Sequence, residues 1–322
     1  MRKLASLAVT AGLLVTLSAC STAPSTTFAD GCGPSGNAAL VTADGPFGAD
    51  PGTDFPTPII APDTDVAVLE RGEGDPIRRD GAIDAAISIY DAATGDPLQS
   101  QSGELVGVAI RTLVEGTFPF TSAFTCTTEG SRVVTTGSPE QLFGPERLGL
   151  AEDQSIVVVS DIQDAYPGRA DGADQLVPAG LPAVVLAPNG RPGFTFPTDT
   201  PPSDLRIAEL KSGRGETVQE GDSVIVNYSG VVWGQADLFD TTWDDRVPRA
   251  VTASDFTQTD DGSGVVPGFA EALIGAKVGS QVIAVIPPEF GYPAGSAPAT
   301  IGEDATLVFV IDILAVQDPA DD

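Results

Sequence analysis

Histidine is absent from this chain of 322 residues, and cysteine occurs three times. A Ser-His-Asp triad is therefore impossible, although serine is abundant. Neither Cys32 nor Cys126 has a histidine or a second cysteine at the spacing of zinc ligands, so a zinc site is not expected. Most familiar polar catalytic groups are missing, and an apolar catalytic pocket becomes the natural candidate.

Basic residues are also scarce, because 16 lysines and arginines stand against 45 aspartates and glutamates, which gives a net charge of −29. Nucleic acid is not expected as a partner, since phosphate contacts require clustered lysine and arginine. The ordinary explanation of such an acidic excess is a soluble, solvated surface. Acidic pairs such as Asp244–Asp245 lack the spacing of a calcium-binding loop, so no metal and no cofactor are expected.

The first 20 residues predict an export signal. Arg2 and Lys3 precede an apolar run, 4–17, which is too short to span a membrane comfortably. The run ends in Leu17-Ser-Ala-Cys20, which resembles a bacterial lipobox, where the peptide is cleaved before a lipidated cysteine. We expect a lipoprotein signal peptide at 1–20, with lipid on Cys20 anchoring the exported chain to the bacterial cell membrane on its extracytoplasmic side. An ordinary secreted protein is the alternative.

Residues 21–49 are rich in Ser, Thr, Gly, Pro and Asp, and they predict a flexible tether. Cys32 in this tether is expected to form a disulfide with Cys126, because exported proteins fold in an oxidising environment. Two separate buried thiols are the alternative.

Beyond the tether, the chain repeats itself at a domain-sized interval. Phe55 and Phe196 lie 141 positions apart, and the strand-like segments that follow them match at the same offset. Later, Ile156–Ile162 matches Leu307–Ile313 after a drift that loop insertions explain. The repeat predicts a first domain at 50–165, a linker at 166–189, a second domain at 190–317 and an acidic tail at 318–322.

Each copy has mostly the β-branched pattern of strands, as in 224–228, 282–286 and the long apolar run 306–314. The one clear helix candidate is 268–276, where apolar residues recur at helical spacing. An antiparallel sheet curled over one short helix buries the apolar face of each element, so the expected fold class is α+β.

Five segments of the second copy stand in a characteristic order and spacing: Val224–Gly230, Leu238–Thr242, Val265–Phe269, Pro288–Tyr292 and Ala305–Phe309. This arrangement resembles the FKBP-type peptidyl-prolyl isomerases, in which these pieces line one apolar pocket that holds a proline side chain. The resemblance covers 190–317 well and 50–165 weakly. It implies two FKBP-like domains, each a curled antiparallel β-sheet wrapped over one short α-helix, with the first domain degenerate.

The resemblance also implies the site residues. Phe269 would form the pocket floor, and Tyr228 would hold Asp240 beside the reacting imide carbonyl. The Tyr292 hydroxyl and the Ile301 backbone N–H would bond carbonyls of the bound peptide. The implied catalytic residues are Tyr228, Asp240, Phe269 and Tyr292, and the implied substrate-binding residues are Phe239, Val251, Val265, Val266, Ile301 and Phe309.

An apolar pocket suits this reaction on physical grounds. Rotation about an Xaa–Pro bond requires loss of amide resonance, and the twisted state has a less polarised carbonyl than the planar one. Water stabilises the planar state more, so a dry pocket lowers the barrier without a nucleophile, base, metal or cofactor. The sequence predicts a peptidyl-prolyl cis-trans isomerase that acts on proline-containing segments of exported proteins and assists their folding.

Several positions depart from the family pattern. Phe269 stands where tryptophan is frequent, Arg249 stands where an aromatic residue is common, and the flap from Tyr292 to Ile301 has alanine and proline instead of bulky groups. These changes bear on the rate and the peptide preference more than on the fold.

The first copy departs further. Ile87 stands at the position of Tyr228, unless a small shift recruits Tyr90, and Val158 replaces Phe309. The Phe-Asp pair is not recognisable there. We therefore expect an inactive domain used for spacing, substrate capture or packing.

Other interpretations stay open. Both domains would serve equally in a non-catalytic peptide-binding or chaperone lipoprotein, or in a structural envelope lipoprotein. Aromatic residues on strands are usually core, so Tyr228 and Tyr292 are also explained as core tyrosines, and Asp240 as a turn residue. Asp161 and Asp312, within apolar strands, are expected to be structural or edge-facing.

Overall fold

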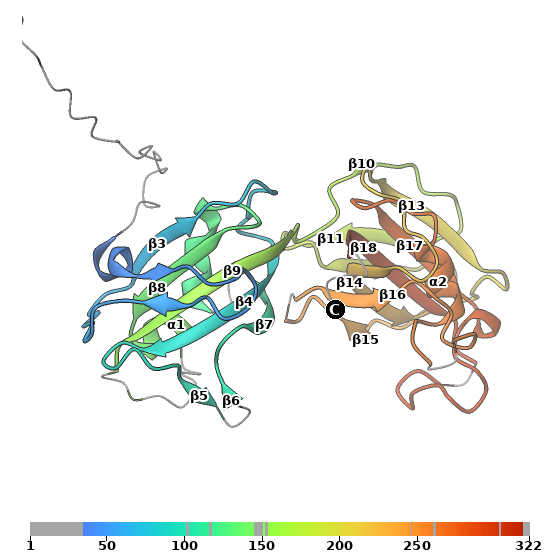
Figure 1. The fold of residues 1–322 in the computed structure, drawn as a ribbon. Helices are drawn as coiled ribbons and strands as arrows, with labels where there is room; N and C mark the ends of the chain where they lie inside the picture. The colour runs from blue at the N-terminus through green and yellow to red at the C-terminus, as the bar shows by residue number, and fades with distance from the viewer. Residues whose placement is uncertain are drawn as a thin grey trace, which may run out of the picture.

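In the computed structural model, Figure 1 shows two sheet-bearing halves of the chain beside one another. The structure describes residues 35–100, 103–115, 118–144, 151, 154–245, 247–259, 262–302 and 304–317. The expected signal peptide, the expected lipidation at Cys20, Cys32 and the tail 318–322 lie outside these residues. Within them, no helix has the length and apolar character needed to cross a membrane.

The N-terminal half contains a five-stranded antiparallel sheet. Its order is β3 (Asp65–Glu70), β8 (Arg132–Gly137), β9 (Ile156–Tyr166), β4 (Ala82–Asp91) and β7 (Val108–Leu113). Among the described residues, its helical segments are η1 (Gly36–Leu40), η2 (Pro119–Cys126) and α1 (Pro139–Phe143). Two short ladders complete it, β1 (Thr42–Ala43) with β2 (Thr53–Asp54), and β5 (Gln99–Ser100) with β6 (Gly103–Glu104).

The C-terminal half contains a seven-stranded sheet. Its order is β10 (Ala173–Asp174), β13 (Arg206–Ser212), β17 (Gln281–Ile286), β18 (Leu307–Gln317), β14 (Ser223–Val232) and β15 (Leu238–Thr241), while β16 (Arg249–Thr252) pairs with the other end of β14. Helix α2 (Pro267–Leu273) and the 3₁₀ turn η4 (Pro288–Phe290) flank β17 along the chain, and β11 (Ala183–Leu186) forms a hairpin with β12 (Pro192–Thr195).

The C-terminal sheet buries both faces. Proline at the first turn starts α2 without losing a helical hydrogen bond, and the helix buries Phe269 and Leu273 against the sheet. The opposite face packs Trp233 and its neighbours against Phe194 and Leu181, which belong to the β11–β12 hairpin and the segment before it. The linker expected at 166–189 thus contributes strands and core contacts to this half.

The central pairings repeat in the two sheets, where β3, β8, β9 and β4 correspond to β13, β17, β18 and β14. β4 shifts register against β9 between Asp84 and Ala85, and β14 shifts against β18 between Ile225 and Val226, 141 positions later. These shared registers put Ile87 at the place of Tyr228. Val158 likewise takes the place of Phe309. Val158 pairs with Ile89 in the N-terminal sheet, and Phe309 pairs with Gly230 in the C-terminal sheet.

In each half, a buried carboxylate on the last strand of the main sheet accepts a hydrogen bond from the backbone of a segment that precedes that sheet. The backbone N–H of Gly48 donates to Asp161 at 2.7 Å, and that of Ala170 donates to Asp312 at 2.9 Å. Asp161 also forms a bidentate ion pair with buried Arg132, at 2.6 and 2.7 Å. Both aspartates are structural and buried, and neither lies on a sheet edge.

At the corresponding place, Asp312 has Gln281 as its partner, at 2.6 Å. Burial without a full countercharge raises the pKa of Asp312 to about 6, although its hydrogen bonds and the charges of Lys211 and Arg169 partly offset the effect.

Residues 35–49 correct the expected tether, because they pack onto the N-terminal sheet. Ala38 and Val41 are buried beside Phe55. The guanidinium of Arg132 donates to the carbonyls of Ala43, Gly45 and Pro46 at 2.8, 2.8 and 3.0 Å. Composition alone suggested a flexible segment, whereas a buried cation supplies the donors that its backbone needs.

The N-terminal half also differs from the expectation of one α-helix over each sheet. At the chain position of α2 it has the 3₁₀ segment η2, and its short α-helix follows β8 instead. Hydroxyls of Thr121, Ser122 and Thr125 donate to carbonyls three residues earlier. Such side-chain bonds compete with the α-helical pattern and favour a tighter turn.

The pKa of Asp312 predicts a pH-dependent stability. Because the folded pKa of about 6 exceeds the ordinary value of 3.8, this group stabilises the fold below pH 4, and the contribution is lost as the pH rises through 6. Asp312→Asn should therefore gain about 2 to 3 kcal/mol relative to wild type between pH 4 and pH 8. Urea unfolding, followed by the fluorescence of Trp233 and Trp243, measures this difference in the free energy of unfolding at each pH. Asp199→Asn, at an exposed position, is the control. A pH-independent difference for Asp312→Asn contradicts the assignment.

Candidate functional site

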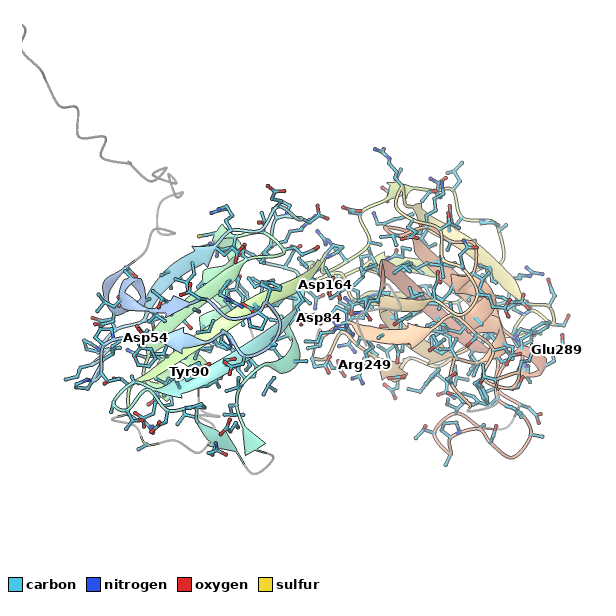
Figure 2. The ribbon with its side chains drawn as sticks, viewed as in Figure 1. Asp54, Asp84, Tyr90, Asp164, Arg249 and Glu289 are labelled. Atoms are coloured by element: carbon cyan, nitrogen blue, oxygen red, sulfur yellow. The ribbon has the colours of Figure 1, made fainter. Side chains whose placement is uncertain are left out.

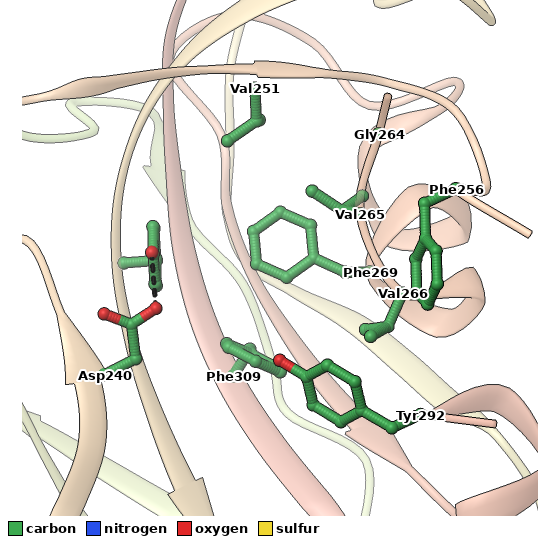
Figure 3. Close-up of a pocket in the computed structure, with 10 residues that line it drawn as sticks. Asp240, Val251, Phe256, Gly264, Val265, Val266, Phe269, Tyr292 and Phe309 are labelled. Carbon is green, nitrogen blue, oxygen red and sulfur yellow. Dashed lines mark hydrogen bonds between the residues drawn. The ribbon is translucent and has the colours of Figure 1, made fainter. Parts of the chain in front are cut away.

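A cavity of about 200 Å³ lies between the C-terminal sheet, α2 and two neighbouring loops (Figure 3). Its lining is mainly apolar, with one carboxylate and two phenols. The lining residues are Tyr228, Asp240, Val251, Phe256, Gly264, Val265, Val266, Phe269, Tyr292 and Phe309.

Three aromatic rings form the inner surface of the cavity. Phe269 from α2 and Phe309 from β18 are 3% and 4% exposed, and their centroids lie 5.0 Å apart at 80°. Tyr228 from β14 meets them edge-on at 5.7 and 6.1 Å. Edge-to-face packing of this kind is favourable and holds each ring in one orientation.

A β-bulge in β15 brings two consecutive side chains to the cavity side of the sheet. Gly230 pairs with Asp240 but Val231 pairs with Leu238, so Phe239 is the extra residue. In a regular strand, consecutive side chains point to opposite faces. Here Phe239 packs edge-on against Phe309 at 5.5 Å, while Asp240 reaches the Tyr228 hydroxyl.

Gly230 leaves the space that these rings occupy. A Cβ atom at this position would lie 2.7 Å from ring atoms of both Phe239 and Phe309, closer than carbon atoms pack. A side chain on β14 at this position would therefore displace the aromatic wall of the cavity.

The Tyr228 hydroxyl donates to Asp240 Oδ2 at 2.7 Å, the bond drawn dashed in Figure 3. Burial raises the pKa of Tyr228 well above its usual range, and the hydrogen bond and charge of Asp240 raise it further. Burial, followed by the charge of Asp240, also raises the pKa of Tyr292. Both phenols therefore stay protonated donors at neutral pH, and neither acts as a base or nucleophile.

The backbone of Tyr228 is fixed by two threonines that follow the bulge. Thr242 Oγ1 accepts the Tyr228 N–H at 3.0 Å and donates to Asn227 Oδ1 at 2.9 Å. Thr241 Oγ1 donates to the Tyr228 carbonyl at 3.1 Å. These bonds hold β15 against β14 and so set the position of Asp240 relative to the cavity.

Most of the residues assigned from the sequence meet at this cavity. Tyr228, Asp240, Val251, Val265, Val266, Phe269, Tyr292 and Phe309 line it. Phe239 lies behind Phe309 as a second layer. Ile301 is buried in the adjacent core, and its N–H already donates to the Pro298 carbonyl at 2.9 Å, so a peptide carbonyl would have to compete for it.

Sequence reasoning missed Phe256 and Gly264, which also line the cavity. Phe256 is the one aromatic residue in the polar segment between Val251 and Val265, and this isolated aromatic residue is the signal in the sequence that could have identified it. Its N–H donates to the Val265 carbonyl at 3.1 Å, which holds the loop against the cavity. Gly264 has φ +116°, and a Cβ atom there would lie 2.3 Å from the Ser254 carbonyl oxygen.

The cavity can enclose a compact apolar group and donate hydrogen bonds at its rim. In Figure 3 the Tyr292 hydroxyl points into the cavity, across from Asp240. In the described part of the chain, no three acidic or cysteine side chains gather as metal ligands. The buried aromatic lining and the protonated phenols suit the binding and desolvation of an apolar group.

The N-terminal half packs a cluster of phenylalanines on the corresponding face of its sheet. Phe118, Phe120, Phe124 and Phe143 contact one another with ring centroids 5.0 to 5.9 Å apart. They pack in one apolar cluster with Ile87 and Val158, on the sheet face that corresponds to the cavity face of the C-terminal half.

Residues 214–314 match the model of a family described as FKBP-type peptidyl-prolyl cis-trans isomerase. An FK506-binding protein of Streptomyces anulatus is 33% identical over 128 residues, covering 39% of this chain and 97% of that protein. A probable FK506-binding protein of Corynebacterium glutamicum is 35% identical over 126 residues, covering 39% and 98%. The crystal structure of FkpA from Escherichia coli aligns with a TM-score of 0.31 at 27% identity, covering 44% of this chain and 53% of that one.

Gly230→Ala tests the packing of the aromatic wall. The added methyl group collides with Phe239 and Phe309, so we expect a loss of about 2 kcal/mol in the free energy of unfolding. Gly193→Ala is the matched control, because its Cβ would meet only the Val185 carbonyl oxygen at an ordinary 3.5 Å. Equal stability of the two variants in urea would contradict the described wall.

Proposed function

This chain belongs to the FKBP-type peptidyl-prolyl cis-trans isomerases, and we propose that the cavity between Asp240 and Tyr292 is where it rotates Xaa–Pro bonds. The observation that carries the assignment is the cavity itself: a space of about 200 Å³ lined mainly by aromatic and branched side chains, with Tyr228, Asp240 and Tyr292 as its polar side chains. A pyrrolidine ring is a compact apolar group that such a space accepts.

Desolvation is the main source of catalysis in this proposal. Phe269 and Phe309 keep water from the imide, and water stabilises the planar bond more than the twisted one. The barrier of an unassisted bond is about 20 kcal/mol, and each reduction of about 1.4 kcal/mol accelerates rotation tenfold. The dry cavity thus lowers the barrier without forming any covalent bond.

The rim groups add orientation and electrostatics. Asp240, held by Tyr228, would face the imide carbonyl oxygen, which carries more negative charge in the planar state than in the twisted one. A nearby carboxylate therefore disfavours the planar state selectively. The Tyr292 hydroxyl would donate to a peptide carbonyl and keep the chain from turning with the bond.

For the N-terminal half, we propose a degenerate FKBP-like domain. Its strand order and register shifts, which repeat those of the C-terminal half, support this. Ile87 and Val158 stand at the places of Tyr228 and Phe309, and four phenylalanines pack in one cluster with them. Such a domain would position substrate or pack against its neighbour.

The proposed clients are proline-containing segments of exported proteins. The chain would be anchored outside the cytoplasm by lipid on Cys20, which would follow cleavage of the signal peptide. Cys126 is disulfide-bonded, which supports an oxidising compartment, and Cys32 is its proposed partner. Isomerisation there would assist folding, because uncatalysed Xaa–Pro rotation takes about tens to hundreds of seconds.

Asp240→Val in the full chain should lower kcat/KM for a proline tetrapeptide by about tenfold or more, equivalent to about 1.4 kcal/mol. The Asp240 side chain is exposed, so the free energy of unfolding should stay close to that of wild type. Asp237→Val, three residues earlier and also exposed, is the matched control. A cis–trans exchange assay measures the rate, and wild type without turnover would instead favour a peptide-binding protein.

Phe269→Leu tests the role of the cavity floor and whether the N-terminal half is inactive. The smaller, non-aromatic floor should admit water and reduce turnover of the full chain by about tenfold. Combined with Asp240→Val, it should reduce kcat/KM by about a hundredfold, because two independent tenfold losses multiply. Turnover that stays at the wild-type level in the double variant would mean that the N-terminal half is active.

A further inference from the structure

Residues 167–170 lie between β9 of the N-terminal sheet and β10 of the C-terminal sheet, and we call them the inter-half connector. Just before them the two halves are bonded directly. Asp84, which Figure 2 labels where the halves meet, accepts the Tyr166 hydroxyl at 2.8 Å. It also accepts a hydrogen bond at 3.3 Å from Gln317, at the end of β18.

The N-terminal half fixes the connector from one side. Tyr166, the last residue of β9, is buried in one apolar cluster with Ile225 and Leu314 of the C-terminal half. Two residues later, the backbone of Gly168 packs closely on the N-terminal half, because a Cβ atom added there would overlap the backbone carbonyl of Asp80. The connector therefore has no room to shift toward the N-terminal half at this point.

The C-terminal half holds the connector from the other side. The side-chain N–H of Asn227 on β14 donates to the Gly168 carbonyl at 3.0 Å, and Asp312 on β18 accepts the Ala170 N–H. Asn227 and Asp312 pair across the two strands, and each is 1% exposed. One buried donor and one buried acceptor, side by side on the sheet, thus satisfy two backbone groups of the connector.

From Asn227 the hydrogen bonds continue to the cavity. The Thr242 hydroxyl donates to Asn227 Oδ1 at 2.9 Å and accepts the Tyr228 N–H at 3.0 Å. The Tyr228 hydroxyl donates to Asp240, which lies two residues before Thr242 on the chain. Consecutive hydrogen bonds therefore join the carbonyl of Gly168 to the strand that carries Asp240.

The Gly168 carbonyl sets the direction of these bonds. A side-chain amide has an acceptor oxygen and a donor nitrogen, whereas a carbonyl can only accept. The nitrogen of Asn227 therefore faces the connector, and its oxygen faces Thr242. The Thr242 hydroxyl must then donate its one proton to Asn227, which leaves its lone pairs for the Tyr228 N–H. Without that carbonyl, the amide can turn its nitrogen toward Thr242, whose oxygen would be shared between two donors.

Asn227 lies on the face of the sheet away from the cavity. Consecutive side chains of a strand point to opposite faces, and the neighbouring Tyr228 lines the cavity. Asn227 is not one of the lining residues. Any influence of Asn227 on a bound peptide must therefore pass through Thr242.

We propose that Asn227 is a positioning residue for isomerisation, and that it holds the Tyr228–Asp240 pair in place from the inter-half connector. This inference rests on the proposed function and gives the N-terminal half a part in it, because that half fixes Gly168. A carboxylate contributes only while it lies within about 0.5 Å of its productive position. The connector supplies a fixed point from which that position is set.

Asn227→Ala in the full chain should lower kcat for a proline tetrapeptide by about fivefold. It should leave KM within about twofold of wild type, because the apolar lining of the cavity is unchanged. In the Asp240→Val background the same substitution should lower kcat by less than about twofold, since its effect passes through that carboxylate. The cis–trans exchange assay, run at several substrate concentrations, measures both parameters.

Asn37→Ala is the matched control. Asn37 also donates its side-chain amide to a backbone carbonyl, that of Ile60 at 3.0 Å, but it lies in the N-terminal half. Its substitution should leave kcat and KM as in wild type.

Thr242→Val breaks the same series of hydrogen bonds one step nearer the cavity and keeps the shape of the side chain. It decides the test if Asn227→Ala does not fold. We expect the same fivefold loss of kcat, and the same disappearance of this loss in the Asp240→Val background. Thr242→Ser keeps the hydroxyl and should keep kcat within about twofold of wild type.

The failures are distinguishable. Wild type without turnover overturns the proposed function itself. Turnover that folded Asn227→Ala leaves unchanged, or losses that multiply when either variant is combined with Asp240→Val, overturn Asn227 as a positioning residue. A loss in Thr242→Val that folded Asn227→Ala does not share assigns the role to Thr242 without the connector, and likewise overturns the proposal.

Discussion

The antiparallel pairing of β14 with β18 is the constraint on which the aromatic cavity depends. It sets Gly230 opposite Phe309 and, two residues away on the same face, Tyr228 opposite Ile311. A slip of one residue would turn Tyr228 or Phe309 to the opposite face, which the β11–β12 hairpin covers. The missing side chain at Gly230 then leaves room for Phe309 and Phe239, so one pairing register and one glycine together create the enclosure.

The two halves show how one scaffold supports different interiors. Both keep the strand order and the register shift in the first long strand, and both keep an aspartate that ties the entering segment. Their interiors differ in where the aromatics stand. In the C-terminal half they surround a cavity, whereas in the N-terminal half four phenylalanines pack against one another. The scaffold is held by backbone pairing, so interior side chains can change without altering the sheet.

The order of five segments from Val224 to Phe309 was sufficient to predict the cavity through their resemblance to the FKBP-type isomerases, which implied that Tyr228, Phe269 and Phe309 line one pocket. The bulge at Phe239 was beyond such reasoning, since it depends on register between strands that alternation does not reveal. The packing of 35–49 was missed for a related reason. The partner of this segment is Arg132, about 90 residues away. No local sequence pattern indicates a buried cation that binds three carbonyls.

The hydrogen bonds that Asp161 and Asp312 accept have a consequence for folding during synthesis. Asp161 binds a backbone group 113 residues earlier, and Asp312 binds one 142 residues earlier. Because the aspartates lie on the final strand of each sheet, neither half can close until its last residues have emerged. Contacts this distant in sequence slow folding. The N-terminal half can nevertheless be complete while the remainder is still being synthesised, so it offers a finished wall on which the catalytic half assembles.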